Sequence, residues 1–134
     1  MSTLAAPERG GPGYGVAMSE DLITTAVTST STEVHGRTIN QARHNYFVID
    51  SPSGPGEALG TSEAFLAGIA ACGVTLVQGV AKAESIAVER LSVEIRGIRL
   101  ASNPVDFHRV ELDFAYRGPS QEQAEHLTKT WQAR

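Results

Sequence analysis

The longest apolar segment of the chain covers residues 64–81 and carries no formal charge. Its apolar positions surround a helical wheel, which is typical of a helix at the centre of a core. Thr61 or Ser62 could cap the start, and Glu63 would then lie in the first turn, where the helix dipole favours a carboxylate. We predict a helix from there to about Glu84.

Strand-like patterns lie on both sides of this segment. Residues 21–33 are rich in threonine and β-branched types, and residues 38–49 end in an aromatic and aliphatic run. Apolar residues nearly alternate over residues 88–100 and again over residues 107–116. Turn residues separate these stretches at His35-Gly36-Arg37, Ser51–Gly56, Ser102-Asn103-Pro104 and Gly118-Pro119.

A second, polar helix is predicted over residues 121–133, with Ser120 as its cap and Glu122 in its first turn. Strands, a helix, two strands and a helix therefore follow one another, which favours the α+β class. Residues 1–20 are rich in glycine and proline, lack an apolar core, and are expected to form a flexible tail before one domain, residues 21–134.

Charge and cysteine content narrow the functional classes. The net charge is −4 and the signs are interspersed, so we expect no nucleic-acid partner. A single cysteine fits a reducing compartment, and we predict a cytoplasmic protein. We expect no membrane span, because Gly68, Gly73 and Gly79 interrupt the apolar segment and no basic cluster flanks it.

Cys72 lies in the middle of the apolar segment. From its position alone it is either an inert small apolar residue or a sheltered nucleophile. We expect no metal and no cofactor: the four histidines lack the spacing of a zinc site, and the Gly54–Gly56 loop lacks the lysine and hydroxyl residue of a phosphate loop.

Several stretches resemble the OsmC/Ohr family. The most specific is the helix that carries Glu63 and Cys72 after a Gly/Pro loop; the others are residues 36–52, 88–97 and 118–125. The resemblance covers roughly residues 22–134. It implies an OsmC-like α+β fold that forms an intertwined homodimer around two long central helices. It also implies reduction of organic hydroperoxides by a reactive cysteine.

The resemblance assigns the reactive thiol to Cys72, a supporting carboxylate to Glu63, and a supporting arginine to Arg37, with Arg43 as the alternative. Characterised relatives carry a second cysteine in a Cys-Pro pair after the last helix. The sequence ends at Arg134, where that pair would be expected. We therefore expect the domain, residues 21–134, to lack the family's C-terminal Cys-Pro segment.

The expected chemistry needs a cation near the thiol. A thiolate attacks the peroxide bond and becomes a sulfenic acid, whereas a thiol buried in apolar surroundings stays protonated unless a charge compensates. Glu63 and Cys72 are nine residues apart, or about 180° around a helix. An arginine from another segment or from a partner subunit must therefore link them.

Two functions are compatible with these residues. The first is a hydroperoxide reductase that uses Cys72 and is regenerated by an external thiol or dithiol. The second is a non-catalytic OsmC-like dimer that binds a small apolar ligand. Simpler roles remain open for each residue: Glu63 suits a helix start on electrostatic grounds alone, and Arg37 suits a solvated turn.

Overall fold

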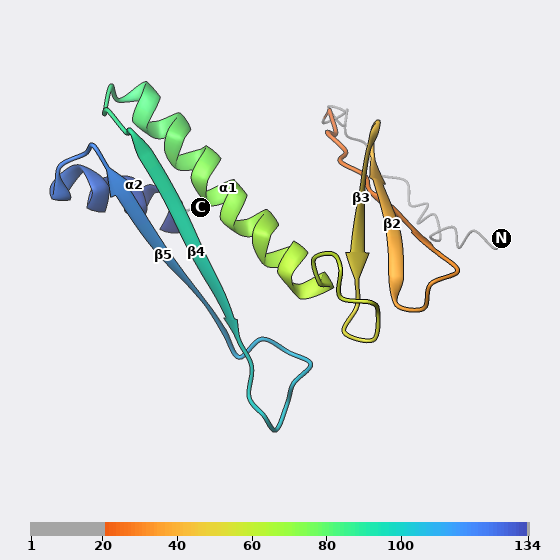
Figure 1. Ribbon diagram of the computed structural model, residues 1–134. Coiled ribbons are helices and arrows are strands. Elements are labelled where there is room, and N and C mark those ends of the chain that lie inside the picture. The colour runs from red at the N-terminus through yellow and green to blue at the C-terminus, as the bar shows by residue number, and fades with distance from the viewer. Residues whose placement is uncertain (1–20, 134) are drawn as a thin grey trace, which may run out of the picture.

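The computed structural model describes residues 21–133. The tail predicted for residues 1–20 lies outside the described part, as does Arg134. The order of elements is three strands, a long helix, two strands and a second helix. Figure 1 labels β2 to α2 along the chain. Their bounds are β1 Thr28–Ser31, β2 Arg37–Ala42, β3 Asn45–Asp50, α1 Thr61–Ala83, β4 Arg90–Ile98, β5 Arg109–Arg117 and α2 Gln121–Gln132.

The strands form two antiparallel sheets. Sheet A has the order β1-β2-β3, and sheet B consists of the β4-β5 ribbon. α1 packs along β4 and against α2, whereas sheet A meets the rest of the chain mainly where β3 touches α1. In Figure 1, sheet A stands beside the start of α1 as a separate layer. The predicted α+β class, with antiparallel strands and a long central helix, is confirmed.

The core lies between α1, sheet B and α2. Gly73, Val77 and Ala81 are the buried residues of α1 and recur every fourth position, which gives one buried stripe. Leu127 of α2 completes the buried cluster with Val77 and Ala81. Gly73 faces the Phe114 ring of β5: a Cβ atom there would lie in ordinary van der Waals contact with the ring, at 3.5 Å.

Several predicted element boundaries need correction. β1 covers only four residues of the stretch predicted from 21 to 33. Arg37 begins β2 and is not part of the turn, since Gly36, with a φ of 78°, makes the reversal. The cap of α1 is Gly60, not Thr61 or Ser62, and it has no side chain to bond the first turn. Ser120 caps α2 as predicted.

The face of α1 opposite the core is uncovered in the single chain. Small and polar residues dominate its exposed positions, and Gly68 and Gly79 have open space around them. By length and composition alone α1 could cross a membrane, and only 17% of its most apolar stretch is buried. Phe65, 58% exposed, is the one large apolar side chain among the exposed positions of α1.

Sheet A is also uncovered, on both of its faces. Ile39, Tyr46, Phe47 and Val48 have exposed fractions of 41–66% although they lie on paired strands. Successive strand residues point to opposite faces, so Phe47 and Val48 expose apolar groups on both sides. A three-stranded sheet normally needs a packing partner for at least one face.

An ion pair joins the central strand β2 of sheet A to the outer strand β3 and to the loop that follows. Arg37 and Asp50 are direct cross-strand partners. Nε and Nη2 of Arg37 donate to the two Asp50 oxygens, each at 2.8 Å. Asp50 also accepts the backbone N–H groups of Glu57 and Ala58. With its side chain 1% exposed, Asp50 fixes the path of residues 51–60.

We expect Asp50→Asn to lower the thermal midpoint of unfolding by several degrees at neutral pH. The Arg37 guanidinium, more than the loop N–H groups, holds the pKa of Asp50 at about 2. A carboxyl with a depressed pKa stabilises the fold above its unfolded pKa near 4, and this stabilisation is lost as pH falls through about 2. The difference in thermal midpoint between Asp50→Asn and the wild type should therefore disappear as pH falls from about 4 to about 2, which melting curves recorded over this pH range would measure.

The matched control is Glu89→Gln, which removes an exposed partner of Arg117. Exposed ion pairs contribute little, so its melting curves should follow those of the wild type at every pH. If the difference in thermal midpoint between Asp50→Asn and the wild type stays constant from pH 7 to pH 2, the Asp50 charge does not have the stabilising role assigned to it.

We expect Leu127→Ala to destabilise the chain by about 3 kcal/mol, the usual cost of truncating a buried leucine. Leu127 is 0% exposed and connects α2 to α1. Val105→Ala, at a position 79% exposed, is the control and should change the free energy of unfolding by less than about 0.5 kcal/mol. Chemical denaturation measures the free energy of unfolding of both variants. Equal losses for Leu127→Ala and Val105→Ala would contradict the position of the core around Leu127.

Candidate functional site

Cys72 lies in the middle of α1 and its side chain is exposed in the single chain. The expectation of a sheltered apolar environment is therefore wrong for one chain alone, because the buried stripe passes through Gly73 instead. Within residues 21–133 no hydrogen bond reaches the Cys72 Sγ atom, and only the Cys72 carbonyl is engaged, by the Thr75 hydroxyl at 3.2 Å. The thiol is open to solvent and to any molecule that covers this face.

Glu63 lies in the first turn of α1, as predicted. Its carboxylate accepts the backbone N–H of Gly60 at 2.7 Å and so closes the start of the helix. Nine residues of helix separate it from Cys72, which is about 13 Å along the axis and half a turn around it. A single chain therefore does not bring the Glu63 carboxylate to the Cys72 thiol.

Arg37 is held near the start of α1, away from Cys72. Besides its two bonds to Asp50, Nη2 donates to Glu57 at 2.8 Å. The bridge between Asp50 and Gly60 places this group beside the first turn of α1. Cys72 lies about 16 Å further along the helix axis, which is more than an arginine side chain can cross. The single chain therefore keeps Arg37 and Cys72 apart.

Arg43, the alternative arginine, occupies the β2–β3 hairpin turn with a φ of 57°. Its side chain is exposed, and its carbonyl accepts the Gln41 amide at 3.0 Å. β3 runs from this turn towards α1, so Arg43 lies at the end of the hairpin remote from the helix (Figure 1). Within residues 21–133 no hydrogen bond links the Arg43 side chain to Cys72.

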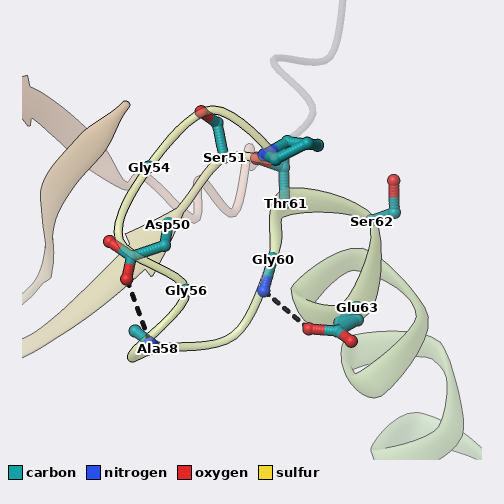
Figure 2. A pocket seen from close by; sticks show the side chains of 10 residues that line it. Asp50, Ser51, Gly54, Gly56, Ala58, Gly60, Thr61, Ser62 and Glu63 are labelled. Atoms are coloured by element: carbon teal, nitrogen blue, oxygen red, sulfur yellow. Dashed lines mark hydrogen bonds between the residues drawn. The ribbon is translucent and has the colours of Figure 1, made fainter. Parts of the chain in front are cut away.

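A cavity of about 430 Å³ lies between the loop after β3 and the first turn of α1. Figure 2 shows the Asp50 and Glu63 carboxylates on opposite sides of it, each bonded to a backbone N–H group. Glycine, serine and proline residues form most of the remaining wall. Glu63 thus lines a cavity whose wall does not include Cys72.

A second guanidinium also reaches the start of α1. Arg99 follows β4, and its Nη2 donates to the Ser62 hydroxyl at 2.8 Å. Its Cζ lies 3.9 Å from the centre of the Phe107 ring, which stacks on Phe65 at 6.2 Å. The Arg99 Nε is buried with no hydrogen-bond partner among residues 21–133. The cation–π contact with the Phe107 ring is thus the main interaction that stabilises the Arg99 guanidinium.

Sequence reasoning missed Asp50, Glu57 and Arg99. The signal for Asp50 was present, since it comes directly after the strand-like run Tyr46–Ile49 and precedes a Gly/Pro loop; the structure makes it the last residue of β3. An acidic residue at such a strand end commonly binds loop N–H groups. Nothing in the sequence links Glu57 to Arg37, because twenty residues separate them.

Comparison with solved structures gives consistent matches over most of the chain. An OsmC-like protein from Mycoplasma pneumoniae matches with a TM-score of 0.74 and 19% identity, over 84% of this chain and 82% of that one. An organic hydroperoxide resistance protein OsmC from Legionella pneumophila matches with 0.64 and 23%, over 85% of both chains. OhrB of Bacillus subtilis, an organic hydroperoxide resistance protein, matches with 0.59 and 20%, over 84% and 86%.

Sequence comparison adds no assignment: no protein-family model matches the chain. No curated protein matches it either. The identities to the solved structures are low, so the likeness concerns the backbone arrangement and not the side chains of the site. The predicted architecture is confirmed at that level: the chain has the OsmC-like fold.

Proposed function

We propose that the protein is a homodimeric, thiol-dependent reductase of organic hydroperoxides with Cys72 as its nucleophile. The observation that carries this proposal is the exposed Cys72 thiol on the uncovered face of the long helix of an OsmC-like fold. Some proteins with this fold are organic hydroperoxide resistance proteins. Arg37 and Glu63 keep the supporting roles expected from the resemblance.

The uncovered surfaces support a second copy of this chain as the partner. Only Val77, Ala81 and Leu127 form the buried core of the described chain, although thirteen large apolar side chains are exposed. Association would bury both faces of sheet A and the small-residue face of α1, which permits close helix approach. We propose that a second protein chain, and not lipid, covers α1.

The same association would complete the site. Because one chain keeps Arg37 about 16 Å along the helix from Cys72, the cation for each thiol would come from sheet A of the second copy. Sheet A contacts its own chain mainly through β3 and α1, so it is free to pack on another molecule. Two equivalent sites per dimer follow from two-fold symmetry.

The proposed reaction has two stages. The Cys72 thiolate attacks the terminal oxygen of the hydroperoxide, the O–O bond breaks, and the alkoxide leaves with a proton as an alcohol. The sulfur is oxidised to a sulfenic acid. An external thiol condenses with it, releasing water, and a second thiol cleaves the mixed disulfide. The guanidinium of Arg37 would stabilise the thiolate and then the charge on the departing oxygen.

One observation favours the alternative, a non-catalytic dimer that binds a small apolar ligand. The Arg37 guanidinium already bonds two carboxylates, those of Asp50 and Glu57, and no cation bonds the Cys72 thiol within the described chain. In that case the apolar surfaces would enclose a ligand, and Cys72 would react no faster than an ordinary free thiol.

We expect the protein to have twice the chain mass of 14.2 kDa in solution, measured by light scattering after size exclusion. Gly68→Leu should yield a monomer, because leucine fits the open space of a single chain but keeps two helices apart. Glu122→Leu, which adds the same side chain on exposed α2 surface, should remain a dimer. A monomeric wild type, or a dimeric Gly68→Leu variant, would contradict this packing.

We expect rapid oxidation of Cys72 by an organic hydroperoxide in stopped-flow mixing, with one oxygen atom added to that residue by mass analysis. Cys72→Ser should abolish the reaction. Arg37→Ala should slow it about a hundredfold, the usual effect of removing one preorganised group that stabilises developing charge. Arg43→Ala, at the exposed hairpin turn, should leave the rate unchanged.

Circular dichroism should first establish that each variant is folded, since Arg37→Ala leaves Asp50 without its counter-ion. A slow Arg43→Ala variant beside an unaffected Arg37→Ala variant would transfer the supporting role to Arg43. Wild-type oxidation no faster than that of free cysteine would reject the reductase and favour the ligand-binding dimer.

A further inference from the structure

The Arg37 guanidinium has two different carboxylate partners. Asp50 is buried, bonds both Nε and Nη2, and is itself fixed by two loop N–H groups. Glu57 has a side chain 73% exposed and shares only Nη2. Exposed ion pairs are weak, whereas buried bidentate pairs are costly to break. Glu57 is therefore the partner that Arg37 can exchange.

The charges of this group oppose the role proposed for Arg37. One guanidinium and two carboxylates sum to −1, and a negative group does not stabilise a thiolate. Among residues 21–133, Nη1 makes no hydrogen bond, and the Arg37 side chain is 22% exposed. Without Glu57, the pair with Asp50 is neutral and Nη1 and Nη2 both have N–H groups to offer.

We propose that Glu57 is a positioning residue that restrains Arg37 and competes with the Cys72 thiolate for its Nη2 group. This inference rests on the proposed function, in which Arg37 supports Cys72. Asp50 anchors the guanidinium, and release of Glu57 makes it available to the thiol of the second copy. Glu57 acts only through Arg37 and does not touch the reacting atoms.

The test is the rate of Cys72 alkylation by iodoacetamide as a function of pH, which needs no peroxide chemistry. Glu57→Gln should react about two to five times faster below neutral pH, the effect of losing one exposed charge. The pH profile should shift to lower pH, and the shift should shrink at high salt. Glu89→Gln, which removes another exposed carboxylate, 61% exposed, from the Arg117 pair, should match the wild type.

A double-mutant comparison shows whether Glu57 acts through Arg37. In a background of Arg37→Gln with Asp50→Asn, the Glu57→Gln effect should vanish. If that background does not fold, Arg37→Lys replaces it, since lysine cannot present the fork that contacts both carboxylates. An unchanged profile for Glu57→Gln, or an effect that persists in the altered background, would overturn the inference.

The two proposals fail in different ways. If the wild type does not reduce hydroperoxides but Glu57→Gln still accelerates alkylation through Arg37, the reductase is rejected and the restraint by Glu57 holds. If hydroperoxides are reduced quickly but alkylation of Glu57→Gln and Glu89→Gln is equal, the restraint by Glu57 is rejected and the reductase holds.

Discussion

The helical repeat of α1 is the constraint on which the rest of the site depends. It places Glu63 and Cys72 on opposite sides of one helix, and it carries Cys72 about 16 Å beyond the turn where Arg37 is held. The buried stripe through Gly73, next to Cys72, directs the thiol away from its own sheet B. No small adjustment within one chain brings these groups together. In the proposed function, the Arg37 guanidinium and the Cys72 thiol are therefore brought together between two chains.

Association and stability follow from the same surfaces. Three residues make up the buried core of the described chain, so α1, sheet B and α2 supply little of the burial expected of a domain this size. Sheet A exposes Phe47 on one face and Val48 on the other. The Arg37–Asp50 pair keeps the β2–β3 hairpin and its loop in shape without a packed core beneath them. Sheet A is thus a preformed element that can pack on a partner.

Local patterns in the sequence predicted most of the fold. The uncharged run around Cys72 gave the long helix, and Ser120 gave the start of α2. The cap of α1 was missed because Gly60 has no side chain of its own, and the cap is marked only by the Glu63 carboxylate, which accepts the Gly60 N–H from three residues further along. The exposure of Cys72 was missed because the sequence of an apolar helix does not show whether its apolar face packs against its own chain or against a second copy. Pairings over long sequence separations, such as Arg37 with Glu57, leave no local pattern.

The position of Arg37 connects folding to chemistry. A guanidinium that only stabilised sheet A would be satisfied by the bidentate contact with buried Asp50. The additional Glu57 contact costs side-chain freedom in an exposed loop and returns little stability. The Glu57 contact does change the net charge of the Arg37–Asp50 pair from neutral to negative. This change affects only a molecule that approaches the pair from outside. In the proposed dimer, where thiol and cation would meet across the interface, the Glu57 contact would hold the Arg37 guanidinium in place until the second chain and its substrate compete for it.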